Sequence, residues 1–211
     1  MGQPGATRGR GRPSTGAKEK ILRAATDVLA ERGVAGLGTK AVAQRAQVAE
    51  SSIFYHFKDR LGLLQAIVSA GVPAFTDVVS ADLGRLPLGE ALARLLDGLE
   101  TMYVAVVPVQ AAVLSDPDLK DVFTRRAAEE GIGPHRALPP VIGYLESEVR
   151  AGRIRADLDL PALALTILAA AHQRALLRHL GTPAALLPSA GAVAGNLALT
   201  LATPARVEPP T

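Results

Sequence analysis

Hydrogen-bonding and basic side chains are grouped in one short stretch of this chain, residues 51–60, which reads Ser-Ser-Ile-Phe-Tyr-His-Phe-Lys-Asp-Arg. Ile53 and Phe57 are four residues apart, so a helix over this stretch has one apolar face turned inward. A short helix of this kind fits the major groove of DNA when polar side chains point outward. The side chains able to point outward are those of Ser51, Ser52, Phe54, Tyr55 and His56.

Other spacings that could carry chemistry are unconvincing, and the sequence predicts no enzyme and no cofactor. Residues 36–41 have the form G-x-G-x-x-A of a dinucleotide fingerprint, but a predicted helix precedes them where that motif requires a strand. His172 and His179 are seven residues apart on one predicted helix, without a carboxylate at ligand spacing, so we expect no metal site. The chain has no cysteine, which excludes disulfides and thiolate zinc sites and fits a reducing cytoplasm.

The elements that would position residues 51–60 form a helix-turn-helix. A long helix from Ser14 or Thr15 to Arg32 is followed by a short one over 39–46 and another over about 51–57. Two short helices joined by a turn of three or four residues are typical of this motif. Its predicted inner face consists of Val42, Ala46, Val48, Ile53 and Phe57.

Local signals mark where these helices begin and end. Gly33 stands where a glycine stops the first helix, and Thr39 is a suitable N-cap for the second. A fourth helix begins near Asp59 and is expected to bury Leu63, Leu64 and Ile67, with Val68.

Positive charge is concentrated at the N-terminal end. Residues 1–70 carry 11 Lys and Arg against 5 Asp and Glu, whereas residues 71–211 carry 12 against 15. A basic third joined to an acidic remainder suggests a polyanion-binding module attached to a second domain. The longest apolar runs without charge, near 160–171 and 190–202, are shorter than the ~20 residues of a membrane span, so we expect a soluble protein with no membrane partner.

Beyond residue 72 the pattern predicts only helices, separated by proline and glycine. The expected segments lie near 88–107, 117–130, 134–151, 160–180 and 189–203. The fold class is therefore all-α: an N-terminal three-helix DNA-binding domain plus a larger helical domain. We place a disordered basic arm at 1–13, the helix-turn-helix domain at 14–70 and the helical domain at 71–211.

Residues 15–68 resemble the DNA-binding domain of the tetracycline-repressor (TetR) family. The stretch 39–48, Thr-Lys-Ala-Val-Ala-Gln-Arg-Ala-Gln-Val, is similar to that family's second helix and turn, and 52–60 is similar to its recognition helix and the start of its fourth helix. The resemblance implies that Thr39 and Lys40 contact phosphates and that Arg60 clamps another. The residues it assigns to base edges and backbone are Ser51, Ser52, Tyr55 and His56, with Lys58 directly behind them.

This chain departs from the family's pattern at three positions, and one further residue lies near the expected phosphates. Phe54 stands where tyrosine is common, and Tyr55 is interpreted as supplying the hydroxyl. Gln47 replaces a turn glycine, so a left-handed backbone there would cost about 1 kcal/mol or more. Ala49 replaces a hydroxyl cap, a loss of about 1 kcal/mol unless Ser51 caps a shorter helix. Glu50 lies close to the expected phosphate path, where it either accepts from a cytosine amine or points away.

The arm carries a second DNA-binding signal. Arg8, Arg10 and Arg12 alternate with glycine and precede Pro13, which resembles the core of an AT-hook. Arginines spaced by glycine can enter a narrow minor groove. The alternative is a solvated leader, and the sequence does not choose between them.

The resemblance also implies a homodimer that binds a palindromic operator and is released by a small-molecule effector held in the C-terminal domain. We expect the last two helices to form the dimer interface, because Gly191 and Gly195 permit close approach. With aromatics at 3% of the chain, the effector should be largely apolar. The predicted pocket residues are Leu99, Met102, Tyr103, Val106, Val113, Phe123, Ile142, Leu168, His172 and Gln173.

Two other classes of protein were weighed against this one. A helical-bundle enzyme or carrier would need a catalytic constellation, and we find none. An architectural DNA-binding protein would not need the 140 residues that follow the DNA-binding module. The prediction is therefore a cytoplasmic, nucleoid-associated transcriptional repressor.

Overall fold

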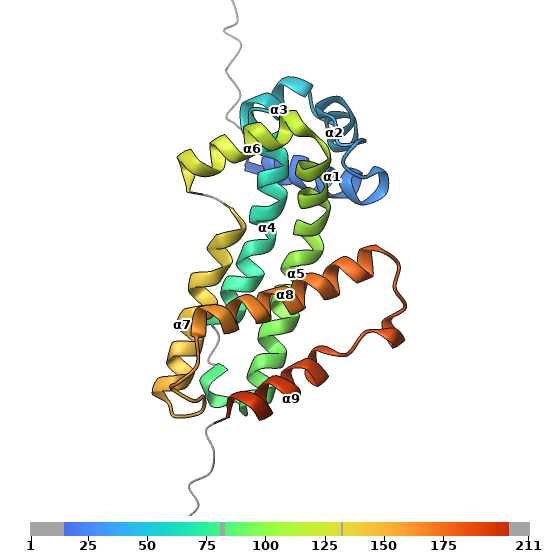
Figure 1. The fold of residues 1–211 in the computed structure, drawn as a ribbon. Coiled ribbons are helices and arrows are strands. Elements are labelled where there is room, and N and C mark those ends of the chain that lie inside the picture. The colour runs from blue at the N-terminus through green and yellow to red at the C-terminus, as the bar shows by residue number, and fades with distance from the viewer. Residues whose placement is uncertain (1–14, 81–82, 132, 203–211) are drawn as a thin grey trace, which may run out of the picture. The chain divides into compact units, whose positions relative to one another are not determined.

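The computed structural model describes residues 15–80, 83–131 and 133–202, and over these ranges the chain is helical (Figure 1). No strand occurs in them, and the one bridge joins Ile154 to Ala202. The chain divides into two compact units, Met1–Ile67 and Val68–Thr211. The α-helices are α1 Thr15–Arg32, α2 Thr39–Ala46, α3 Glu50–Phe57, α4 Arg60–Ser80, α5 Leu88–Ser115, α6 Pro117–Glu130, α7 Leu138–Arg150, α8 Leu160–His179 and α9 Ala190–Leu201. Three short 3₁₀ helices lie at Leu83–Arg85, Pro134–Ala137 and Ala184–Leu186.

The N-terminal unit is built as its apolar pattern predicts. Ile21, Ala25 and Val28 of α1 are buried, and so are Val42 of α2 and Ile53 of α3. Burial of these side chains against one another fixes α2 and α3 on α1, because each helix has only one apolar face. The result confirms the all-α class and the N-terminal three-helix arrangement.

The C-terminal unit has its core where α5 packs against α8 and α9, with α7 packed on α8. Four leucines of α5 are fully buried in this core, together with Ala164, Ile167 and Ala171 of α8. The predicted starts of the last two helices are confirmed, since Asp159 accepts from the Ala162 amide and Ser189 from the Ala192 amide, each at 3.0 Å. These caps satisfy amides that have no partner within the helix.

Helix α5 is eight residues longer than predicted, because it passes through Pro108 without ending. A proline inside a helix removes the amide that would bond the carbonyl four residues earlier, here that of Val104. The ring Nε2 of His179 lies 2.8 Å from this carbonyl oxygen and can donate to it. A side chain of α8 thus replaces the missing backbone bond, and the helix continues.

Two other predicted details were wrong. Thr39 is the first residue of α2 and not its cap; Gly38 holds the cap position, without a side-chain hydrogen bond. The segment expected at 134–151 begins as a 3₁₀ turn and becomes α-helical only from Leu138, after which Pro139 and Pro140 occupy the first turn, where proline needs no partner.

Three helices, α5, α8 and the segment Ala184–Leu201, are long and apolar enough to cross a membrane by length and composition alone. The apolar run near 160–171 is part of the longer α8, whereas the run near 190–202 coincides with α9. Half of the most apolar window of α5 is buried within the chain, but only 17% of that in Ala184–Leu201. Leu199 of α9 is 83% exposed, so this helix presents an apolar surface that the described part of the chain does not cover.

Candidate nucleic-acid interface

Helix α3 presents a polar face to solvent. Tyr55 is 72% exposed and Phe54 51%, whereas Ile53 and Phe57 of the same helix are buried. The Tyr55 and His56 rings meet edge to face with their centroids 5.0 Å apart. Among the predicted contact residues, Lys40, Ser51, Tyr55 and Lys58 are exposed, and Thr39, Ser52, His56 and Arg60 are partly exposed. The predicted arm residues Arg8, Arg10 and Arg12 lie outside the described residues.

The turn between α2 and α3 depends on Gln47, which has the left-handed conformation anticipated from the sequence (φ 55°, ψ 45°). The amide of Val48 donates to the carbonyl of Ala43 at 3.1 Å, and so closes the end of α2. Helix α3 then begins at Glu50, with Ala49 at the cap position and no side-chain cap bond. Ser51 therefore does not take over the cap.

The end of α3 is held by an unusual turn. Lys58 has φ 67° and ψ −55°, and the amide of Asp59 donates to the carbonyl of Phe57 at 2.8 Å, which closes a three-residue γ-turn. Asp59 then caps α4 by accepting from the Gly62 amide at 2.7 Å. A Cβ at Gly62 would overlap the Phe57 carbonyl oxygen. Glycine at this position therefore allows α4 to start directly against the end of α3, a feature that the sequence did not reveal.

Two polar contacts connect α2 and α4 to the rest of the domain. Arg60 donates to the carbonyl of Val34 at 2.6 Å, and so ties α4 to the loop between α1 and α2. Arg45 pairs with Glu31 of α1, and this hydrogen bond lowers the pKa of the Glu31 carboxyl. Arg60 thus has a structural contact in addition to the phosphate role that the resemblance implies.

Thr39 and Glu50 link the first turns of α2 and α3. The Thr39 hydroxyl donates to Oε1 of Glu50 at 2.6 Å. The carboxylate is exposed at the start of α3, where the partial positive charge of the helix N-terminus favours it. Glu50 is therefore oriented by a specific contact and does not simply extend into solvent.

The predicted effector residues differ in how far they are buried. Leu99, Met102, Tyr103, Val113 and Leu168 are buried, and Gln173 is exposed. His172 and Tyr103 meet edge to face with their centroids 5.0 Å apart, and His172 Nε2 lies 2.8 Å from Oε1 of Gln110. The remaining three, Val106, Phe123 and Ile142, are partly buried.

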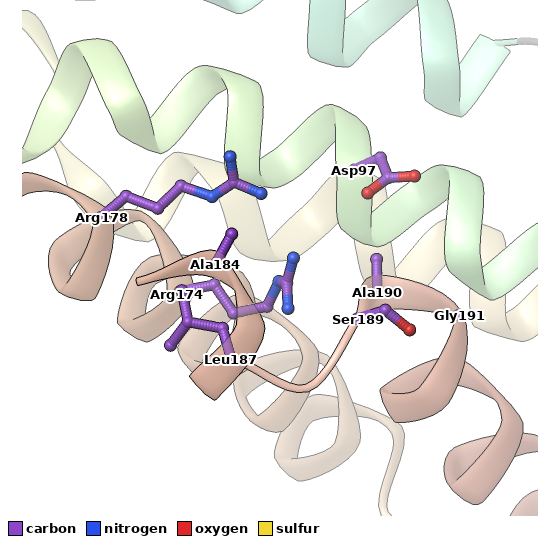
Figure 2. A pocket seen from close by; sticks show the side chains of 8 residues that line it. All are labelled: Asp97, Arg174, Arg178, Ala184, Leu187, Ser189, Ala190 and Gly191. Atoms are coloured by element: carbon purple, nitrogen blue, oxygen red, sulfur yellow. The ribbon is translucent and has the colours of Figure 1, made fainter. Parts of the chain in front are cut away.

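A pocket of about 350 Å³ lies between α5, α8 and the start of α9 (Figure 2). Its arginines are held by a buried carboxylate: Arg174 Nε bonds Glu100 Oε2 at 2.7 Å, and Arg178 pairs with the other oxygen. Arg174 also donates to the carbonyl of Pro188. The lining residues are Asp97, Arg174, Arg178, Ala184, Leu187, Ser189, Ala190 and Gly191. None of them was predicted, because their proximity depends on how α8 and α9 pack on α5.

Comparisons with known proteins agree with this geometry. Residues 21–67 match the family model described as bacterial regulatory proteins, tetR family. The chain is 40% identical over 50 residues to the class A tetracycline repressor protein from transposon 1721 of Escherichia coli, which is 24% of this chain and 23% of that protein. It is 39% identical over 51 residues to the uncharacterized HTH-type transcriptional regulator YvkB of Bacillus subtilis, or 24% of this chain and 27% of that protein. The matched segments thus span about a quarter of these relatives.

Solved structures extend the likeness of fold to nearly the whole chain. Salmonella enterica GusR matches with a TM-score of 0.70 at 18% identity, covering 92% of this chain and 99% of that one. A TetR-family transcriptional regulator from Cytophaga hutchinsonii matches with a TM-score of 0.67 at 15% identity, covering 93% and 100%. With the helix-turn-helix geometry above, these matches show that residues 21–67 are similar to the DNA-binding domain of tetR-family regulatory proteins and that the chain shares their fold.

Proposed function

We propose that this chain is a transcriptional repressor that binds a palindromic operator as a homodimer and leaves it when a small molecule binds the C-terminal unit. The observation that carries the proposal is the exposed polar face of α3, on which Tyr55 is held outward by the burial of Ile53 and Phe57. Side chains at the start of such a helix reach base edges, and flanking basic residues position it on phosphates. Thr39, Lys40, Ser51, Ser52, Tyr55, His56, Lys58 and Arg60 are proposed as the contacts.

The dimer is proposed to form through α8 and α9. Leu165 of α8 is 60% exposed and Leu199 of α9 is 83% exposed, so pairing with a second copy would remove apolar surface from water. A buried ion pair, Arg174 with Glu100, joins α8 to α5, which favours packing in a globular domain over insertion in lipid. We therefore propose a cytoplasmic protein acting on nucleoid DNA.

The effector is proposed to be largely apolar and to bind among the side chains near Tyr103 and His172. His172 supplies a polar anchor there, since its Nε2 already forms a hydrogen bond with Gln110 from the opposite helix. The effector would release DNA only as far as it prefers the conformation that does not bind the operator.

The test is a mobility shift on duplexes selected from random DNA, with and without a metabolite extract. The expected result is a retarded complex that the extract dissociates, with a footprint of two half-sites about one helical turn or more apart. Sedimentation should give a dimer at micromolar concentration. A stable monomer that retards no duplex would overturn the proposal.

A further inference from the structure

An acidic side chain stands at the position of α3 that is best placed to reach bases. Glu50 is the first residue of the helix, and its side chain is exposed. The N-terminal residues of a recognition helix contact base edges in the major groove. A carboxylate there is repelled by phosphates, so it weakens DNA binding unless a hydrogen-bond donor of the DNA compensates it.

The Thr39 hydroxyl holds this carboxylate and leaves acceptor capacity free. It donates to Oε1 at 2.6 Å, which fixes the side chain between the starts of α2 and α3. An ionised carboxylate has two oxygens and about four lone-pair sites, and it can only accept. The group is thus oriented before DNA arrives, and it can accept a further hydrogen bond.

The major-groove edges of the four bases differ in what they offer to a fixed acceptor. Guanine presents two acceptors, and thymine presents an acceptor and a methyl group. Neither base can therefore donate a hydrogen bond to a carboxylate from these groups. Adenine presents an amine beside the N7 acceptor, which opposes the second carboxylate oxygen. Cytosine presents its N4 amine without an adjacent acceptor. Resting on the DNA-binding function proposed above, we propose that Glu50 selects cytosine at one position of each operator half-site by accepting from the N4 amine.

A different role for the same contact predicts other results. In this alternative, the Thr39–Glu50 hydrogen bond breaks when Thr39 binds a phosphate, and Glu50 contacts no base. Glu50 then lowers the affinity for DNA equally for all sequences. Loss of the carboxylate would then raise affinity uniformly and leave base preference unchanged.

The experiment is selection from randomised duplexes with the full chain, followed by sequencing, for wild type, Glu50→Gln, Glu50→Ala and Thr39→Val. Wild type should enrich cytosine at one position of each half-site. Glu50→Gln should change that base to adenine, because a carboxamide pairs with N6 and N7 together. Glu50→Ala should lose preference at that position alone. Thr39→Val should still select cytosine but less strongly, since the carboxylate remains and is no longer held in place.

Affinities for single-base variants of the selected duplex provide the quantitative test. Replacing the cytosine should weaken wild-type binding about tenfold and leave Glu50→Ala binding nearly unchanged. Enrichment of the same half-site by wild type and both Glu50 variants would overturn the cytosine contact while DNA binding itself stood. Failure of wild type to enrich any sequence would overturn both proposals. The glutamine of Glu50→Gln is nearly isosteric with glutamate, so this variant still tests the cytosine contact if Glu50→Ala fails to fold.

Discussion

The buried carboxylate of Glu100 should be one of the most costly residues to remove from the C-terminal unit. It is 5% exposed and pairs with Arg174, which is itself 8% exposed, and with Arg178. Glu100→Leu would leave the Arg174 guanidinium buried without its counter-charge. Breaking a buried pair in this way costs about 3–5 kcal/mol, a large part of a total stability of about 5–15 kcal/mol.

The two arginines should respond differently when they are replaced. The Arg178 side chain is 54% exposed, so it can turn into water, and Arg178→Ala should cost less than about 1 kcal/mol. Arg174 has no such freedom. The double variant Glu100→Leu/Arg174→Met removes both buried charges and fills similar volume, and such replacements are often neutral. It should therefore recover most of the stability lost in Glu100→Leu.

Urea unfolding followed by far-UV circular dichroism, at one fixed protein concentration, measures these differences. The matched control is Glu146→Ala, which breaks an exposed pair with Arg150 whose nearest atoms are 3.9 Å apart, and it should change stability by less than about 0.5 kcal/mol. The reasoning fails if Glu100→Leu costs no more than this control. It also fails if the double variant is as unstable as the single one.

Three further perturbations address other contacts. Gly62→Ala should weaken DNA binding at least tenfold because its Cβ would displace the carbonyl at the end of α3, and anisotropy with a selected duplex measures this; unchanged affinity would contradict it. His179→Ala should lower the free energy of unfolding by about 1 kcal/mol because it leaves the Val104 carbonyl unpaired. This loss should be smaller in a Pro108→Ala background, because alanine restores the backbone amide that bonds the same carbonyl. Equal losses in both backgrounds would show that His179 does not replace the amide missing at Pro108. Deleting residues 1–13 removes Arg8, Arg10 and Arg12 from both subunits of the dimer. The slope of log affinity against log salt concentration should then fall by as much as about 5, whereas a solvated leader predicts an unchanged slope.

The N-terminal unit was largely predictable because its signals are local. The apolar spacing of α1 and the glycine stop at Gly33 (φ 64°) act within a few residues of the positions they specify, whereas the left-handed turn at Gln47 was considered only because the family's pattern has a glycine there. The wrong prediction in this unit, the N-cap of α2, also concerned a contact between residues close in sequence. Thr39 proved not to be a cap because its hydroxyl bonds Glu50, eleven residues away, in place of its own helix.

The C-terminal unit was predicted less well because its decisive contacts join distant residues. Helix α5 continues past Pro108 because of a donor from His179, and 75 residues separate this donor from the carbonyl it bonds. The pocket likewise depends on Arg174 and Glu100, which are 74 residues apart. Periodicity identifies which residues are apolar, but it does not identify which helix faces which.

The central claim is that the polar face of α3 binds DNA, and Tyr55→Ala tests it most directly. The side chain is 72% exposed, so its truncation should leave the unfolding midpoint and the dimer unchanged. Fluorescence anisotropy of a duplex selected by the wild-type protein, titrated with both proteins at one salt concentration, measures the effect on binding. We predict at least a tenfold loss of affinity for the variant. Equal affinity of the two proteins for this duplex would contradict the assignment of α3 as the recognition helix.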